Sequence, residues 1–221
     1  MEVKLKSITP DIETNIVEIA RVSSNRKNKK ESPEKLINYL IKNNHWSPFE
    51  HGFLTMEIKT SKAIGIQLLR HRSFTFQEFS QRYAKVTEIE PVNFRLQAEK
   101  NRQSSTESLG TTTVKENEWK FEGDHNCSQY IAMTEAGDLM VKVQKLYNRM
   151  VDMGIAKECA RMILPMSTQT TIYMTGPVRS WIHLLDVRDD SHAQLEIQLI
   201  AKEIKRIFKE NCPLISAARK Y

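Results

Sequence analysis

The alternation of hydrophobic and polar residues predicts three β-strands. Residues 3–8 alternate in this way and end before Pro10. Between residues 52 and 60, every second side chain is apolar, which is typical of a strand with one buried face. The segment 168–175 is rich in β-branched and aromatic residues, and these favour a strand.

A second pattern, with apolar residues three or four positions apart, predicts helices between and after these strands. The predicted helices begin near residues 11, 32, 61, 128, 156, 177 and 193. Ser61 is the expected N-cap of a helix over 61–72, and Gly154 is the expected C-cap of a helix that starts at Ser128. We therefore expect an α+β fold with a small, mostly antiparallel sheet and several surrounding helices in one domain spanning 1–221.

Two segments show neither pattern clearly. The segment 87–127 is polar and rich in Ser and Thr, so we expect a variable, partly mobile insertion, with Trp119 and Phe121 pinning its far end. The basic segment 24–32 is expected to be a solvated loop.

Composition and charge narrow the class of protein. The net charge of +6 favours anionic partners such as nucleotides. The cysteines Cys127, Cys159 and Cys212 are far apart and odd in number, which indicates neither a disulfide framework nor a metal site. The sequence contains no apolar run of membrane-spanning length and does not open with a secretory signal. We expect a cytoplasmic protein, in the host cytoplasm if the protein is viral.

The stretch from residue 67 to residue 83, QLLRHRSFTFQEFSQRY, concentrates the candidate chemistry of the chain. Its polar candidates are Gln67, Arg70, His71, Arg72, Glu78, Ser80 and Arg82. Arginine offers a fork of donors that matches phosphates and carboxylates. Cations held near buried apolar groups are costly without an anionic partner, so the stretch indicates a phosphate-bearing ligand. The alternative is a helix end with solvated basic residues.

Local geometry is expected to aim these side chains at one ligand. On the predicted helix 61–72, Gln67, Arg70 and His71 stand at i, i+3 and i+4 and therefore share one face. In an extended segment, the alternating polar residues from 78 to 82 would point the same way.

Further candidates lie outside this stretch. Arg161 stands among apolar residues just before Pro165, where the alternative is a surface salt bridge. Arg179 and His183 are one turn apart on the same face of a predicted helix. His45 is either a site residue or a residue that closes the C-terminus of the preceding helix.

The spacing of these motifs resembles that of a known family. Arg70-His71-Arg72, followed after seven residues by Ser80, resembles the RHR-x7-S signature of flavin-dependent thymidylate synthases. Further matching segments occur in the expected order: ARVS (20–23), PFEH (48–51), CARMILP (159–165) and 179–194. The resemblance covers most of the chain and leaves out chiefly 87–127.

The resemblance implies roles for individual residues. The positions that match dUMP-binding residues are Gln67, Arg70, Glu78, Phe79, Ser80, Arg82, Arg161 and Arg188. The positions that match FAD-binding residues are Ser47, Arg70, His71, Arg72, Glu78, Arg179 and His183, with His45 on the folate or flavin side. Arg188 is the implied catalytic residue, a fixed cation that stabilises negative charge on the uracil ring.

The reaction implied by the resemblance transfers the methylene of methylenetetrahydrofolate to dUMP. Reduced FAD supplies the hydride and NADPH restores the flavin, which leaves dTMP and tetrahydrofolate. None of the three cysteines lies in a catalytic context, so no cysteine nucleophile is expected. The family also implies a homotetramer with active sites shared between subunits.

Two positions depart from the family pattern. Pro177 and His183 stand where many members carry asparagines, so one side-chain contact to FAD is absent and another is changed. The sequence lacks a GxGxxG fingerprint, so no Rossmann domain is implied and NADPH is expected to use the same open pocket.

The alternatives are a basic nucleic-acid-binding module and another flavoprotein reductase. The net charge and the aromatic residues near the RHR cluster could serve phosphate binding and base stacking. Glu78 among the arginines and the matching distant segments favour the enzyme, so we expect no nucleic-acid or membrane partner.

Overall fold

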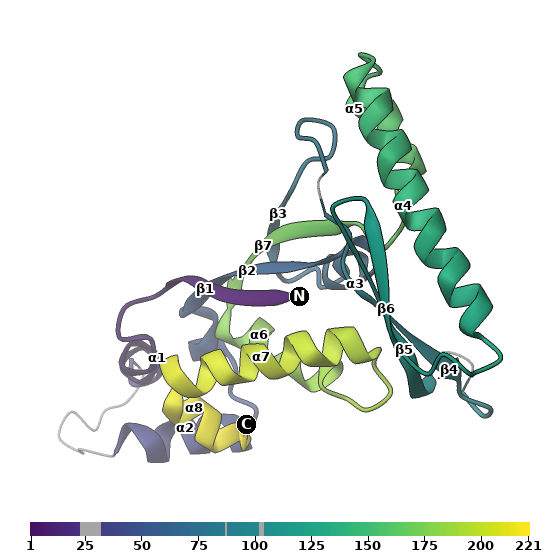
Figure 1. Ribbon diagram of the computed structural model, residues 1–221. Helices are drawn as coiled ribbons and strands as arrows, with labels where there is room; N and C mark the ends of the chain where they lie inside the picture. Colours follow the sequence, from purple (N-terminus) through teal and green to yellow (C-terminus); the bar gives the residue numbers. More distant parts are fainter. Residues whose placement is uncertain (23–31, 87, 102–103) are drawn as a thin grey trace. The chain divides into compact units, whose positions relative to one another are not determined.

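The computed structural model describes residues 1–22, 32–86, 88–101 and 104–221 (Figure 1). It contains helices and two small antiparallel sheets, so the predicted α+β class is confirmed. The chain forms two compact units: unit 1 with residues 1, 59–68 and 78–171, and unit 2 with residues 2–58, 69–77 and 172–221. A single domain stays a prediction. The loop predicted over 24–32 lies, except for its last residue, outside the described residues.

The three predicted strands all form. They are β1 (Glu2–Ile8), β2 (Phe53–Ser61) and β7 (Gln169–Pro177), which join β3 (Thr75–Glu78) in a sheet of order β1-β2-β7-β3. Along β2 the apolar residues at alternate positions are buried, as the sequence pattern predicts.

Unit 2 carries most of the predicted helices. The helices of this unit are α1 (Ile12–Ala20), α2 (Pro33–Lys42), the 3-10 helix η1 (Ser47–Glu50), α6 (Val178–Arg188), α7 (Leu195–Asn211) and α8 (Pro213–Arg219), of which η1 and α8 are not predicted. The fully buried side chains of Phe49, Trp181 and Phe208 contribute to the core of this unit. Burying a large aromatic side chain removes much apolar surface from water, so these residues contribute strongly to its stability.

Unit 1 contains α3 (Lys62–Leu68), α4 (Tyr130–Asp152), α5 (Lys157–Ala160) and the 3-10 helix η2 (Arg161–Ile163). The N–H of Ile64 donates to Oγ of Ser61 at 3.4 Å, in agreement with the predicted N-cap. Gly154, just after α4, has φ of +83°, which confirms the predicted glycine at the end of that helix.

The segment 92–123 folds as an antiparallel sheet that the sequence analysis does not predict. Its strands are β4 (Val92–Gln97), β5 (Ser105–Lys115) and β6 (Glu118–Gly123), in the order β4-β5-β6. The turn between β5 and β6 consists of Glu116 and Asn117, both with positive φ, which is the geometry of a type I′ hairpin.

This sheet packs on α4 (Figure 1). Nε1 of Trp119 donates to Oδ1 of Asp138 at 2.7 Å, and a Cβ at Gly137 would lie 2.5 Å from the indole ring. Glycine at this position therefore allows the close approach of β6 to the helix. Trp119 anchors the far end of the segment, as the sequence analysis expects.

The helix predicted over 61–72 ends at Leu68. Arg70 and His71 lie in the turn after α3, so the prediction that they share a helical face with Gln67 is wrong. The chain turns here because Phe74 is buried against Trp181 at a ring distance of 4.7 Å, which a longer helix would prevent.

The extended segment predicted over 78–82 is also shorter than expected. β3 ends at Glu78, and the N–H groups of Tyr83 and Ala84 donate to the carbonyl oxygen of Ser80 at 3.1 and 3.0 Å. Ser80 and Arg82 therefore lie in a turn, and the predicted alternation with Glu78 is wrong. In this turn the two N–H groups donate to a nearby carbonyl oxygen, whereas in a strand they would need a neighbouring strand as their partner.

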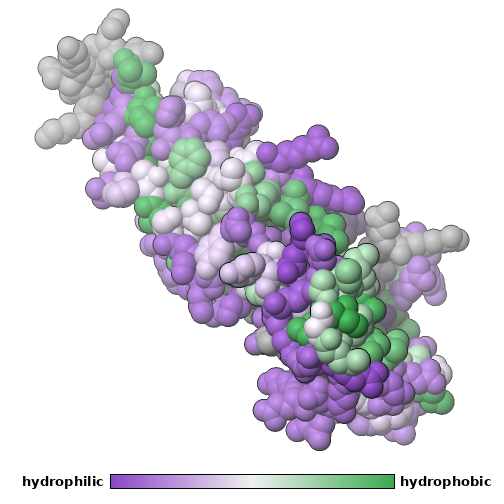
Figure 2. All heavy atoms as spheres, turned by 90° about the horizontal axis from the view of Figure 1, so that it is seen from above, coloured by the Kyte–Doolittle hydropathy of each residue, from purple (hydrophilic) through white to green (hydrophobic). Residues whose placement is uncertain are grey.

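The surface seen in Figure 2 is mostly hydrophilic and contains hydrophobic patches. Exposed apolar residues of unit 1 include Met153, Ile155 and Met162, which lie in or near the connection between α4 and η2. Within the described ranges, the model contains no helix with the length and hydrophobicity needed to cross a bilayer.

Candidate active site

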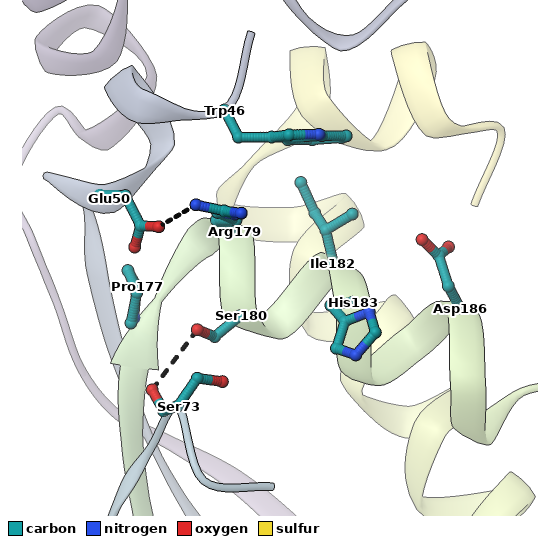
Figure 3. A pocket seen from close by; sticks show the side chains of 9 residues that line it. All are labelled: Trp46, Glu50, Ser73, Pro177, Arg179, Ser180, Ile182, His183 and Asp186. Carbon is teal, nitrogen blue, oxygen red and sulfur yellow. Dashed lines mark hydrogen bonds and ion pairs between the residues drawn. The ribbon is translucent and has the colours of Figure 1, made fainter. Parts of the chain in front are cut away.

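Helix α6 lines a cavity of about 500 Å³ in unit 2 (Figure 3). The residues around the cavity come from η1 and the residue before it, from the turn before β3, from the end of β7, and from α6 itself. They are Trp46, Glu50, Ser73, Pro177, Arg179, Ser180, Ile182, His183 and Asp186.

The rotation of α6 is fixed by its buried tryptophan. Nε1 of Trp181 donates to the carbonyl oxygens of Leu54 at 3.3 Å and Gly176 at 3.1 Å. Arg179 and His183 consequently lie on the exposed face of the helix and border the cavity, which confirms that they share one face.

The cavity has an apolar side and charged groups with partners. In Figure 3 the indole ring of Trp46 extends over the cavity and faces Ile182. Nη1 of Arg179 contacts Oε1 of Glu50 at 2.7 Å, and Asp186 forms an ion pair with Arg219 of α8. The Arg179–Glu50 pair is largely exposed, so we expect it to contribute little to stability and to leave Arg179 able to exchange partners.

His71 and Arg188 form the most direct contact between two predicted site residues. Nε of Arg188 donates to Nε2 of His71 at 2.9 Å. Burial, followed by the charges of Arg188 and His183, lowers the pKa of His71 to about 4. Burial, followed by the charge of Arg70, lowers the pKa of Arg188. Unit 2 thus brings Arg70, His71, His183 and Arg188 within electrostatic range of one another.

Three further predicted site residues of unit 2 are Arg72, Ser47 and His45. Arg72 is exposed in the turn after α3, and Ser47 begins η1 between two cavity residues. The N–H of His45 donates to the carbonyl oxygen of Leu40 at 2.8 Å, and its ring packs edge-on against Tyr39. This geometry favours the structural interpretation of His45, that it closes α2.

In unit 1, Glu78 and Arg82 already have protein partners. Oε1 of Glu78 accepts from Nζ of Lys62 at 2.7 Å and from Oγ1 of Thr170 at 2.8 Å. Nη2 of Arg82 lies 3.1 Å from Oε2 of Glu158, in a largely exposed ion pair. The Arg82–Glu158 pair is accessible enough for a ligand to replace one partner, whereas the contacts of Glu78 are partly buried.

Arg161 and Phe79 are positioned by packing. Arg161 begins η2, and its Nε is buried without a hydrogen-bond partner among the described residues. Such a donor is costly unless a ligand or water satisfies it. Phe79 packs against the cluster of Val86, Tyr147 and Ala160, and its N–H donates to the carbonyl oxygen of Thr171.

The two sets of predicted residues divide between the units. Gln67, Glu78, Phe79, Ser80, Arg82 and Arg161 of the dUMP set lie in unit 1, whereas Arg70 and Arg188 lie in unit 2. The FAD set lies in unit 2 except for Glu78.

The sequence analysis misses several residues that line the cavity. They are Trp46, Glu50, Ser73, Ser180, Ile182 and Asp186, together with Pro177, which it notes only as a departure. Asp186 follows Arg179 by seven positions, so helical periodicity could have placed it on the same face. The described residues contain no cluster of His, Cys, Asp or Glu suited to a metal ion.

Comparison with known proteins assigns the family. The model of the family described as thymidylate synthase complementing protein matches residues 4–214. A probable flavin-dependent thymidylate synthase of Paramecium bursaria Chlorella virus 1 is 43% identical over 99% of this chain and 98% of its own length. The chain belongs to the flavin-dependent thymidylate synthase family.

Two other members of this family extend the match. The flavin-dependent thymidylate synthase of Synechocystis sp. is 44% identical over 90% of this chain and 85% of its own length. That of Thermosipho melanesiensis is 35% identical over 89% of this chain and 81% of its own length. These matches confirm the resemblance drawn from the RHR-x7-S spacing.

The lowered pKa of His71 predicts a pH dependence of stability. Between about pH 4 and about pH 6.5, the unfolded chain binds a proton at His71 that the folded chain does not, so the free energy of unfolding falls as the pH is lowered through this window. His71 contributes no such dependence above that range. Replacing His71 with Gln should flatten the fall.

The measurement is the melting temperature of the ligand-free wild type and His71→Gln at about pH 7.5 and about pH 5. Acidification should lower the wild-type value more than that of the variant. Equal decreases would show that His71 titrates in the folded chain as it does in the unfolded one.

Proposed function

We propose that this chain is a thymidylate synthase that converts dUMP to dTMP with methylenetetrahydrofolate, FAD and NADPH. The observation that carries the proposal is the partly buried Arg188, bonded to His71 and close to Arg70, on a helix that lines the cavity. A cation of this kind is suited to stabilising negative charge on a ring substrate.

The lining of the unit 2 cavity fits a flavin nucleotide. Trp46 and Ile182 provide an apolar side for a planar ring, while Arg179 and His183 provide donors for polar and anionic groups. We assign FAD binding to Ser47, Arg70, His71, Arg72, Glu78, Arg179 and His183. When bound, FAD carries the hydride from NADPH that reduces the transferred one-carbon unit to a methyl group.

dUMP binding is assigned to the basic and polar residues of the RHR-x7-S region and of η2. Arg70 and Arg82 bind the phosphate, and the buried Nε of Arg161 gains a partner when the nucleotide binds. Gln67, Glu78, Phe79 and Ser80 contact the rest of dUMP, and Glu78 exchanges a protein partner for it. We further propose a homotetramer whose active sites receive residues from more than one copy of the chain.

Arg188 activates the pyrimidine by electrostatics. C5 of uracil becomes nucleophilic as the ring gains enolate-like character, and a guanidinium stabilises that negative charge while remaining protonated. The balanced reaction is dUMP, methylenetetrahydrofolate, NADPH and a proton to dTMP, tetrahydrofolate and NADP⁺.

The cysteines offer no better nucleophile. Cys212 is buried, and burial raises the pKa of its thiol to about 12, so it is not a thiolate at neutral pH. Cys127 and Cys159 lie outside the cavity lining.

The direct test is dTMP formation by the purified protein with dUMP, methylenetetrahydrofolate and NADPH, with FAD present or removed. We expect product only with FAD. A protein that forms no dTMP when loaded with FAD, or that forms it equally well without flavin, would contradict the proposal.

Replacing Arg188 separates ring activation from flavin binding. Arg188→Ala should retain bound FAD and its reduction by NADPH, while dTMP formation falls by roughly 10²-fold or more because a charge-stabilising donor is lost. Arg188→Lys keeps the charge without the planar fork and should not restore the rate. Flavin absorbance reports reduction, and product analysis reports transfer.

A near-normal rate of dTMP formation in Arg188→Ala would remove Arg188 from the chemistry. Loss of both half-reactions together would indicate that Arg188 supports the fold instead.

A further inference from the structure

We propose that His71 is a positioning residue, whose ring accepts a hydrogen bond from Nε of Arg188 and holds the guanidinium in its reactive orientation. This inference rests on the proposed function, in which Arg188 stabilises charge on the uracil ring. It assigns to His71 a task in addition to flavin binding.

The direction of the bond follows from the chemistry of the two groups. Arginine has only donors, so at 2.9 Å Nε2 of His71 must be the acceptor. The imidazole is therefore neutral, with its proton on Nδ1. The low pKa of His71 agrees with this state, because it keeps the ring an acceptor throughout the neutral range.

The bond fixes the plane of the guanidinium. Nε is the guanidinium nitrogen bonded to the rest of the side chain, and it lies in the guanidinium plane. A hydrogen bond from Nε to a fixed acceptor therefore restricts the direction in which the guanidinium points. Orientation matters because an electrostatic donor assists a reaction only when it points to where charge develops.

The acceptor is itself held by the core of unit 2. The ring of His71 packs edge-on against Phe74, with centroids 6.3 Å apart, and Phe74 packs against Trp181 at 4.7 Å. Gly176 admits Phe74, because a Cβ there would lie 2.4 Å from the phenyl ring. Trp181 belongs to α6, the helix that also carries Arg188. Donor and acceptor thus depend on one buried aromatic cluster.

A second contact joins the same two segments. Oγ of Ser180 donates to the carbonyl oxygen of Ser73 at 3.4 Å (Figure 3). The turn that carries His71 and the helix that carries Arg188 are therefore tied at two points, which keeps the histidine within reach of Nε.

The experiment compares two replacements of His71 in the FAD-loaded enzyme. His71→Gln can place an acceptor oxygen near the position of Nε2, whereas His71→Leu has a similar size and no acceptor. We expect His71→Leu to lower kcat for dTMP formation by about 10-fold or more, with a smaller change in KM for dUMP, because a bond to a charged group is lost. His71→Gln should restore most of the lost kcat.

Two readouts separate positioning from general damage. In an Arg188→Ala background, His71→Leu should have little further effect on kcat, because the residue acts through Arg188. The Nε–H resonance of Arg188, followed by NMR, should be protected from solvent exchange in the wild type and in His71→Gln and lose that protection in His71→Leu.

The proposal is wrong if His71→Leu lowers kcat by the same factor with and without Arg188, or if Gln is no better than Leu. Loss of FAD from both variants would assign His71 to the flavin alone and would also overturn it. Wild-type protein that forms no dTMP would refute the proposed function and the catalytic role, whereas unchanged protection of Nε–H in His71→Leu would refute the positioning contact itself.

Discussion

The partial burial of the Arg188 cation, close to a second cation at Arg70, is the constraint on which the unit 2 site depends. Arg188 lies partly buried and within range of Arg70, and both effects lower its pKa. Such an arrangement costs free energy unless the neighbouring groups are neutral or an anion binds. His71 meets the first requirement as a neutral acceptor, and a nucleotide phosphate or flavin would meet the second. The buried contact of Phe74 with Trp181 holds the residues together in the absence of that anion.

The repeating patterns of the sequence predict the secondary structure well wherever burial is regular. β2 and α6 form as predicted because their apolar residues follow the period of one element and face one core. The end of α3 could not be predicted, because the packing of Phe74 against a residue more than a hundred positions away decides where the chain turns. The sheet β4-β5-β6 was missed although apolar and polar residues alternate along β4, because the long central strand β5 is dominated by Ser and Thr and the hairpin turn lacks glycine.

The candidate site could be predicted only in part for a similar reason. Site residues that belong to one motif, such as Arg70 and His71, can be predicted from the sequence. The family resemblance adds Arg179 and Arg188 to the predicted site. Trp46 and Ile182 border the same cavity although they come from separate segments, and no local spacing relates them. The bond between His71 and Arg188 likewise joins two motifs that the sequence treats as independent.

The central claim is that a fixed cation, and not a thiolate, activates the uracil ring. Because the chain has only three cysteines, the most direct test is the rate of dTMP formation by a variant that lacks them all, with Cys127→Ser, Cys159→Ser and Cys212→Ala combined. Its melting temperature and bound flavin would establish that it is folded. The account predicts a rate close to that of the wild type. A folded, flavin-loaded variant that forms no dTMP would contradict it.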